Sequence, residues 1–232
     1  MTAFICLTYD DALPIHREWV APYLAERGLY GTFYVPAARD DLHDALEDWR
    51  QVAAMGHELG NHSCWHPCRT RPDWDWKPPY RLEEYDRARI RDELLMANRV
   101  LQLVDGKTER SYGATCGDLT CGKGESFIDD IRDLFTVVRS GTSDQPLIGR
   151  PDFIVPSFHG DHRRAEEIIA VAETMRGQSD AWLVVIMHGV GIGTHNSFID
   201  ADEHRRLLDW IAVQRDWLHA VTMLEATHNR IG

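Results

Sequence analysis

Short apolar runs alternate with amphipathic stretches along the whole chain. The apolar runs predict strands at Phe4–Tyr9, Gly31–Val35, Phe135–Val138, Phe153–Val155, Trp182–Met187 and Ala220–Met223. The run Trp182–Met187 has no polar member, which is typical of a parallel strand that is covered on both faces. Amphipathic stretches predict helices at Ile15–Glu26, Asp44–Met55, Leu82–Val104, Arg163–Met175 and Asp202–Gln214. Strand followed by helix, repeated with short connections, indicates an α/β fold made of βα units.

The length of 232 residues suits one α/β barrel, and no repeat or low-complexity linker divides the chain, so we expect a single domain over residues 1–232. The 37 acidic residues outnumber the 25 basic ones, and the net charge of −12 argues against a nucleic acid or an anionic membrane as partner. No run approaches the ~18 apolar residues of a membrane span. No signal-peptide pattern is visible either, so we expect a cytoplasmic protein, with a removed presequence as the alternative.

The first predicted strand ends in two adjacent carboxylates, Asp10 and Asp11. Ligands of parallel α/β folds bind at the carboxyl ends of the strands, and neighbouring carboxylates repel unless a cation or a proton relieves them. A chain that leaves its strand can turn both side chains toward one ion, so that one carboxylate ligates it and the other acts as a base. The alternative is that one of the two aspartates caps the following helix.

Two further stretches carry histidines at positions that fit the same site. His62 and His66 are four residues apart, which brings both rings to one side of a turn. Together with one aspartate they form a three-ligand set with an open position, the arrangement of catalytic zinc. His188 ends the apolar strand Trp182–Met187 and is placed to act as a general acid, although a buried, hydrogen-bonded core histidine is the alternative.

Three of these stretches resemble signature motifs of the polysaccharide deacetylases, the metal-dependent carbohydrate esterases of family 4 that share the NodB homology domain. They are Thr8-Tyr9-Asp10-Asp11, His62-Ser63-Cys64-Trp65-His66 and Ile186-Met187-His188, in matching order and spacing. The resemblance implies a distorted (β/α) barrel, often with seven strands. It also implies Asp10 as general base, His188 as general acid, and Asp11, His62 and His66 as ligands of a divalent metal such as zinc.

The middle of the chain departs from this family pattern. The usual Arg-x-Pro-aromatic-Gly motif falls near Glu109–Gly117, where the proline is missing and the arginine is displaced. We therefore place Tyr112 at the substrate and name Arg139 and Arg110 as candidates to orient the base, with Arg139 also counted as substrate-binding. We expect Cys116 in the barrel mouth near the His62–Cys68 loop. The acidic residue that supports the catalytic histidine has no clear position in the sequence.

The cysteines and the segment Arg69–Tyr80 each have two possible interpretations. The five cysteines are odd in number and unevenly spaced, which predicts ordinary reduced thiols, with a four-thiolate zinc made by Cys64, Cys68, Cys116 and Cys121 as the alternative. The segment Arg69–Tyr80 is rich in tryptophan and proline and predicts a long ordered loop. Its aromatic side chains either pack the loop onto the barrel or stack on a sugar ring.

We expect a metal-dependent hydrolase that removes acetyl groups from an N- or O-acetylated carbohydrate. A metal-dependent amidohydrolase of a small non-sugar amide is one alternative, and a non-catalytic metal- or sugar-binding relative is another. The last has no need for both Asp10 and His188.

Overall fold

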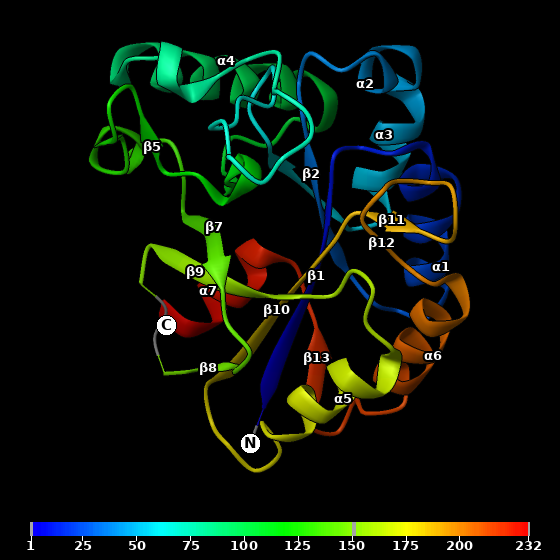
Figure 1. The fold of residues 1–232 in the computed structure, drawn as a ribbon. Helices are drawn as coiled ribbons and strands as arrows, with labels where there is room; N and C mark the ends of the chain where they lie inside the picture. Colours follow the sequence, from blue (N-terminus) through cyan, green and yellow to red (C-terminus); the bar gives the residue numbers. More distant parts are fainter. Residues whose placement is uncertain (1, 150–151, 232) are drawn as a thin grey trace.

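Seven parallel strands form a closed barrel in the computed structural model, which describes residues 2–149 and 152–231 (Figure 1). In barrel order the strands are β1 (Ala3–Asp10), β2 (Gly31–Val35), β3 (Glu58–Asn61), β4 (Ser111–Gly113), β7 (Val137–Thr142), β9 (Ile154–His159) and β10 (Ala181–Met187). The barrel closes where β10 pairs with β1, with Phe4 opposite Trp182 and Tyr9 opposite Met187. The predicted distorted (β/α) barrel with seven strands is confirmed.

Short strands extend this barrel without opening it. β13 (Leu218–Ala220) pairs with the first residues of β1, whereas β2 pairs with the last ones. β8 (Leu147–Ile148) pairs antiparallel with the start of β10. Two small ribbons lie in the loops, one of β5 (Thr120–Cys121) with β6 (Glu125–Ser126), the other of β11 (Gly189–Val190) with β12 (Phe198–Ile199).

Helices surround the barrel, except that the last one contributes residues to the cluster inside it (Figure 1). They are α1 (Ala21–Glu26), α2 (Asp40–Asp44), α3 (Leu46–Ala54), α4 (Arg87–Asp105), α5 (Ala165–Glu173), α6 (Ala201–Ala212) and α7 (Met223–Ile231). The π-helical segment η1 (His16–Val20) precedes α1, and 3₁₀ turns are η2 (Leu82–Glu84), η3 (Thr115–Gly117) and η4 (Asp129–Ile131). Among the described helices, none combines the length and apolarity that crossing a bilayer requires.

Alternation along β1 decides which of its side chains face the site. Ile5, Leu7 and Tyr9 belong to the large core between the strands and the helices. Cys6 belongs to a separate cluster that lies inside the barrel with residues of β2, β7, β9, β10 and α7. Because successive strand residues point to opposite faces, Asp10 shares the inner face with Cys6 and stands at the carboxyl end of the barrel.

Several elements differ from the sequence prediction. Strands β3 and β4 were not predicted, because they are short and contain buried polar residues whose partners are distant in sequence: Glu58 accepts hydrogen bonds from Thr32 and Ser111. Of the predicted strand Ala220–Met223 only Ala220 lies in a strand, at the end of β13, and Met223 already begins a helix. There the chain starts α7, whose Met223 N–H donates to Thr32 Oγ1 at 3.0 Å.

Candidate active site and metal centre

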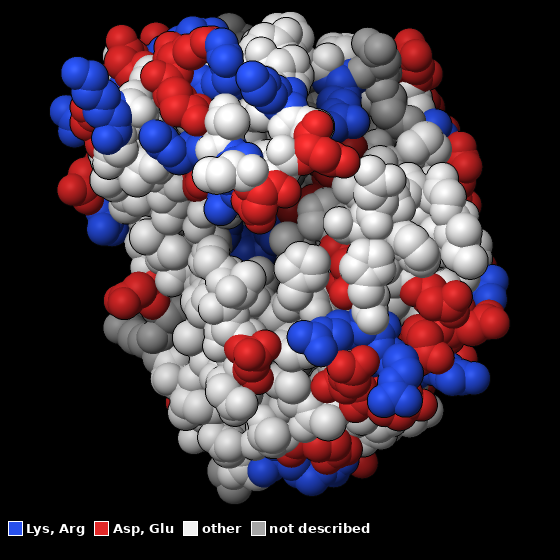
Figure 2. Space-filling model, in the orientation of Figure 1, with Lys and Arg blue, Asp and Glu red and all other residues white. Residues whose placement is uncertain are grey.

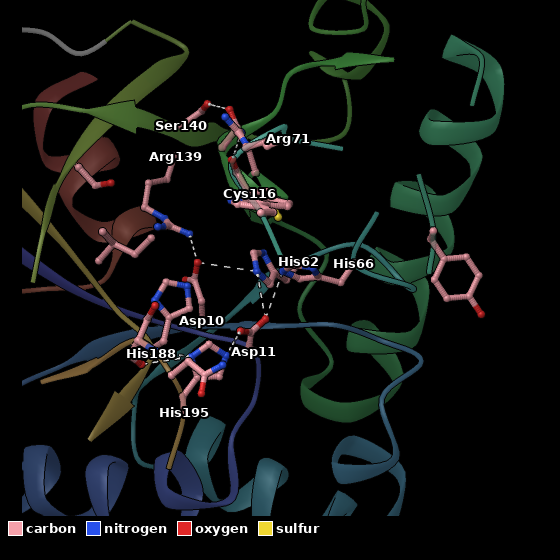
Figure 3. A pocket seen from close by; sticks show the side chains of 18 of the residues that line it. Asp10, Asp11, His62, His66, Arg71, Cys116, Arg139, Ser140, His188 and His195 are labelled. Atoms are coloured by element: carbon pink, nitrogen blue, oxygen red, sulfur yellow. Dashed lines mark hydrogen bonds and ion pairs between the residues drawn. The ribbon is translucent and has the colours of Figure 1, made fainter. Parts of the chain in front are cut away.

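Asp10 and Asp11 both face the mouth of the barrel and are almost fully buried, at 3% and 6% exposure. Asp11 adopts the left-handed conformation, with φ of 77°, which few residues other than glycine take up. This turn brings the Asp11 side chain back to the side that Asp10 faces (Figure 3). The helical-cap alternative does not hold, because η1 is preceded by Ile15 and no side chain caps it.

Asp11, His62 and His66 come together at this mouth, and one potential ligand atom from each lies within 4.8 Å of the others. Oδ1 of Asp11 is 3.2 Å from Nε2 of His66 and 3.7 Å from Nε2 of His62. The Nδ1–H of His62 donates to the Gly113 carbonyl at 2.7 Å, which leaves its Nε2 lone pair directed at the cluster. Burial lowers the pKa of His62 to about 4, so this ring is neutral at neutral pH.

This cluster fits a divalent cation such as zinc. Oδ1 of Asp11 is buried and has no hydrogen-bond donor in the described structure, so a cation would satisfy it. Two imidazole nitrogens and one carboxylate oxygen are a donor set that zinc accepts. Burial works to raise the pKa of Asp11, but the nearby His66 and His62 outweigh it and hold the pKa below its usual range.

Arg139, on β7, forms an ion pair with Asp10 across the barrel, with 2.6 Å between Nη2 and Oδ2. Burial works to raise the pKa of Asp10, but the Arg139 guanidinium and His62 outweigh it and keep the carboxyl ionised. Gly113 leaves room for this pair, because a Cβ there would lie 2.8 Å from Arg139 Nη2. Arg110, the other candidate, instead pairs with Asp105 at 2.6 Å in a fully buried ion pair away from the cavity, so it does not orient the base.

His188 is held by Asp161, a residue that the sequence analysis missed. The His188 ring Nδ1 donates to Asp161 Oδ2 at 2.6 Å, and the His188 backbone N–H donates to Oδ1 at 3.0 Å. Burial alone would lower the pKa of His188, but this hydrogen bond and the Asp10 carboxylate raise it to about 9. The only sequence signal for Asp161 is its position just after β9, at the same end of the barrel.

His195 is a second residue that the sequence analysis missed. Its ring stacks on that of His188, with 5.3 Å between centroids and an interplanar angle of 11°. Its Nε2 lies 3.5 Å from Asp11 Oδ2, the oxygen that does not face His62 and His66 (Figure 3). The Ser197 N–H donates to His195 Nδ1 at 3.0 Å, and the same Nδ1 lies 3.2 Å from the Ser197 carbonyl oxygen, so contacts with Ser197 hold the ring in place.

Tyr112 does not contact this cavity, contrary to the prediction. Gly113 faces the barrel interior, so its neighbour on β4 points outward. The Tyr112 ring is fully buried and stacks on Phe135 with 5.2 Å between centroids, in a core cluster between β4, α4 and η4. We therefore remove Tyr112 from the substrate-binding residues.

The cysteines also differ from the prediction of five reduced thiols. Cys68 and Cys116 form a disulfide, which excludes the four-thiolate zinc site in this structure. Cys6, Cys64 and Cys121 are buried thiols outside this disulfide. Cys116 does lie at the barrel mouth beside the His62–Cys68 loop, as predicted, and lines the cavity. A pairing across 48 residues leaves no local pattern in the sequence.

The site lies in an open cavity of about 1180 Å³. Figure 2 shows it as a hollow near the centre of the face, with charged side chains of both signs around it. One wall comes from the loop Arg69–Tyr80, where Trp74 stacks on Trp76 with 4.9 Å between centroids, and from Trp65, which stacks on Tyr80. The aromatic side chains thus pack on one another and also border the cavity.

Comparisons with known proteins agree with this geometry. The sequence profile of the polysaccharide deacetylase family matches residues 2–122. The chain belongs to the polysaccharide deacetylase family. No curated protein sequence matches it.

Solved structures of other polysaccharide deacetylases share the fold. A structure from Mycobacterium smegmatis assigned to this family is 16% identical, with a TM-score of 0.70 over 99% of this chain and 90% of that one. The peptidoglycan deacetylase PdaC from Bacillus subtilis is 14% identical, with a TM-score of 0.62 over 98% and 91%. A family 4 acetyl xylan esterase from Clostridium thermocellum, in complex with a cobalt ion, is 17% identical, with a TM-score of 0.58 over 97% and 91%.

Proposed function

We propose that this polysaccharide deacetylase family member is a metal-dependent hydrolase that removes acetyl groups from an N- or O-acetylated carbohydrate. The observation that carries the proposal is the three-ligand cluster of Asp11, His62 and His66 with two supported groups beside it. One is Asp10, held by Arg139, and the other is His188, held by Asp161. A bound divalent ion, zinc in our proposal, would lower the pKa of a water molecule and polarise the acetyl carbonyl.

Asp10 accepts the proton of the attacking water. Its carboxylate is buried at the mouth, and its Oδ1 has no hydrogen-bond donor among the described residues, so this oxygen keeps its lone pairs for the proton. Arg139 keeps Asp10 ionised and fixes its other oxygen. The substrate role first given to Arg139 is therefore replaced by the orientation of the base.

His188 donates the proton that the leaving group needs. Amides cleave only when the departing nitrogen is protonated, and a pKa of about 9 keeps His188 protonated at neutral pH. Because Asp161 binds Nδ1, the Nε2–H of His188 is the donor that remains for the substrate. Acetate and the deacetylated amine or alcohol are the products.

The cavity and its aromatic wall support a carbohydrate as the substrate. A cavity of about 1180 Å³ exceeds the size of one acetylated sugar, and aromatic side chains at its border are suited to stack on sugar rings. The alternative of a small non-sugar amide predicts equal turnover of short and long substrates. The alternative of a non-catalytic relative leaves the two supported groups, Asp10 and His188, without a role.

Acetate release from a panel of substrates tests this proposal. The panel contains peptidoglycan, acetyl xylan, an acetylated amino-sugar oligomer, its monomer and a small non-sugar acetamide. We expect acetate from at least one acetylated carbohydrate after addition of Zn²⁺ or Co²⁺, and more from the oligomer than from the monomer. Release from the small acetamide alone would favour the amidohydrolase, and no release from any substrate would favour the non-catalytic relative.

A further inference from the structure

The Cys68–Cys116 disulfide lies directly beside one residue of the proposed metal cluster. It joins the segment that follows β3 to the turn η3, which follows β4. Sγ of Cys68 is 3.5 Å from Nδ1 of His66. Potential ligand atoms of His66, Cys68 and Cys116 all lie within 4.8 Å of one another, so one nitrogen and two sulfur atoms come within reach of a single ion once the Sγ–Sγ bond is open.

His66 thereby faces two different donor sets with its two ring nitrogens. Nε2 lies 3.2 Å from Asp11 Oδ1, in the cluster that also contains His62, whereas Nδ1 faces Cys68. A neutral imidazole carries a proton on one nitrogen and a lone pair on the other. Without losing that proton, His66 can therefore ligate an ion on only one side at a time.

We propose that reduction of the Cys68–Cys116 disulfide creates a second metal site from His66 Nδ1 and the two thiolates, for a soft divalent cation of the zinc type. This site and the Asp11–His62 cluster share His66 and compete for it. A dithiol supplies two electrons and two protons: the Sγ–Sγ bond breaks, both cysteines become thiols, and the dithiol closes to a cyclic disulfide. Cation binding then releases the two thiol protons.

Other contacts hold the two segments together when the disulfide is open. Thr115 Oγ1 donates to the Pro67 carbonyl at 2.5 Å, and Arg71 Nη2 donates to the Cys116 carbonyl at 2.8 Å. The Arg69 N–H donates to Asp118 Oδ2 at 3.0 Å. Because none of these contacts involves a sulfur atom, the thiols stay near His66 after reduction.

The chemistry of this donor set favours zinc. Thiolate and imidazole are the ligands of zinc sites, and a nearby arginine such as Arg71 stabilises thiolates. Cys116 lines the open cavity, so a small reductant can reach the disulfide. Cys64, the nearest other thiol in sequence, donates to the Glu93 carbonyl and lies outside the cluster.

Absorption spectroscopy with Co²⁺ tests the proposal on the full chain, without a substrate. A phosphine is the reductant of choice because dithiols bind cobalt themselves. The phosphine becomes the phosphine oxide by taking the oxygen of one water molecule.

We expect a thiolate-to-cobalt charge-transfer band after reduction and none in the oxidised protein. Cys68→Ser abolishes the band, and Cys121→Ser, a matched change of a buried free cysteine, retains it. A reduced wild-type protein without the band would overturn the proposal.

Two histidine variants test whether His66 is shared. In the reduced protein, His62→Ala weakens the competing Asp11–His62 cluster, so the thiolate band is kept and saturates at a cobalt concentration no higher than in wild type. His66→Ala weakens cobalt binding at least about 10-fold, the loss seen on removing even a supporting contact of a metal ligand. Circular dichroism establishes that each variant is folded. A band of undiminished affinity in folded His66→Ala would show that the thiolates bind without His66 and would contradict the shared site.

Discussion

Arg139 Nη2 lies 2.6 Å from Asp10 Oδ2, and the two side chains are 3% and 4% exposed. Asp10 lies on β1 and Arg139 on β7, on opposite sides of the closed barrel, so the ion pair crosses the barrel mouth. The ion pair explains why the Asp10 carboxylate, which is buried next to Asp11, remains ionised. It also makes Arg139 responsible for both the charge and the orientation of the proposed base.

Replacing Arg139 by methionine should damage stability and turnover together. The change leaves the Asp10 charge buried and unpaired, which costs about 3–5 kcal/mol in the free energy of unfolding. We expect a lower denaturant midpoint and a strongly reduced kcat for acetate release. Arg110→Met, which breaks the other buried arginine pair, is the matched control: it should cost similar stability but leave the kcat of the folded protein near that of wild type. Equal losses of kcat in both folded variants would argue against a role of Arg139 at the base.

The Asp161–His188 hydrogen bond predicts the alkaline limb of the pH profile. His188 must be protonated to act as the acid, so activity on an acetamide sugar is present below a pH of about 9 and is lost as the pH rises through that value. Asp161→Asn removes the negative charge that raises the pKa, so the limb moves to lower pH and kcat falls by roughly 10²–10⁴-fold.

An aryl acetate supplies the control for this prediction, because its leaving group departs without a proton. Asp161→Asn and His188→Ala should impair its hydrolysis much less than that of the acetamide sugar. Equal losses on both substrates would assign His188 to substrate positioning or to the oxyanion.

His195 should strengthen metal binding without ligating the metal. Its Nε2 lies 3.5 Å from Asp11 Oδ2, so it supports the carboxylate on the side away from His62 and His66. Loss of such a supporting group lowers metal affinity about 10–100-fold, and we expect this of His195→Ala. Titration with Zn²⁺ measures the effect, and Asn196→Ala next to it should bind as wild type does. An unchanged zinc affinity in His195→Ala would contradict the proposed support of Asp11 by His195.

Local patterns predicted much of the barrel. The run Gly31–Val35 forms β2 with the predicted bounds. The run Trp182–Met187 forms β10 with one more residue at its start, because a wholly apolar run is buried whatever its partners. The short strands β3 and β4 were missed, since Glu58 becomes buried through hydrogen bonds from residues of β2, β4 and α7 that are distant in sequence. These hydrogen bonds, which compensate for burying Glu58, form only in the closed barrel and leave no local pattern in the sequence.

Within the site, too, some residues have a local sequence pattern and others depend on the tertiary fold. Asp10, Asp11 and His188 follow apolar runs, so their convergence at the carboxyl ends of the strands could be predicted. Asp161, His195 and the disulfide partners lie in loops, and their roles arise from contacts between loops that the tertiary fold brings together.

Paired measurement of metal content and acetate release in wild type, Asp10→Asn and Asp11→Asn tests the central claim most directly. We predict that Asp10→Asn retains its metal and loses at least about 10²-fold in turnover, as expected for a missing general base. Asp11→Asn should lose the metal itself, and wild type stripped by a chelator should regain activity when Zn²⁺ or Co²⁺ is restored. Full activity of chelator-stripped wild type, or metal loss in Asp10→Asn with metal retained in Asp11→Asn, would contradict this account.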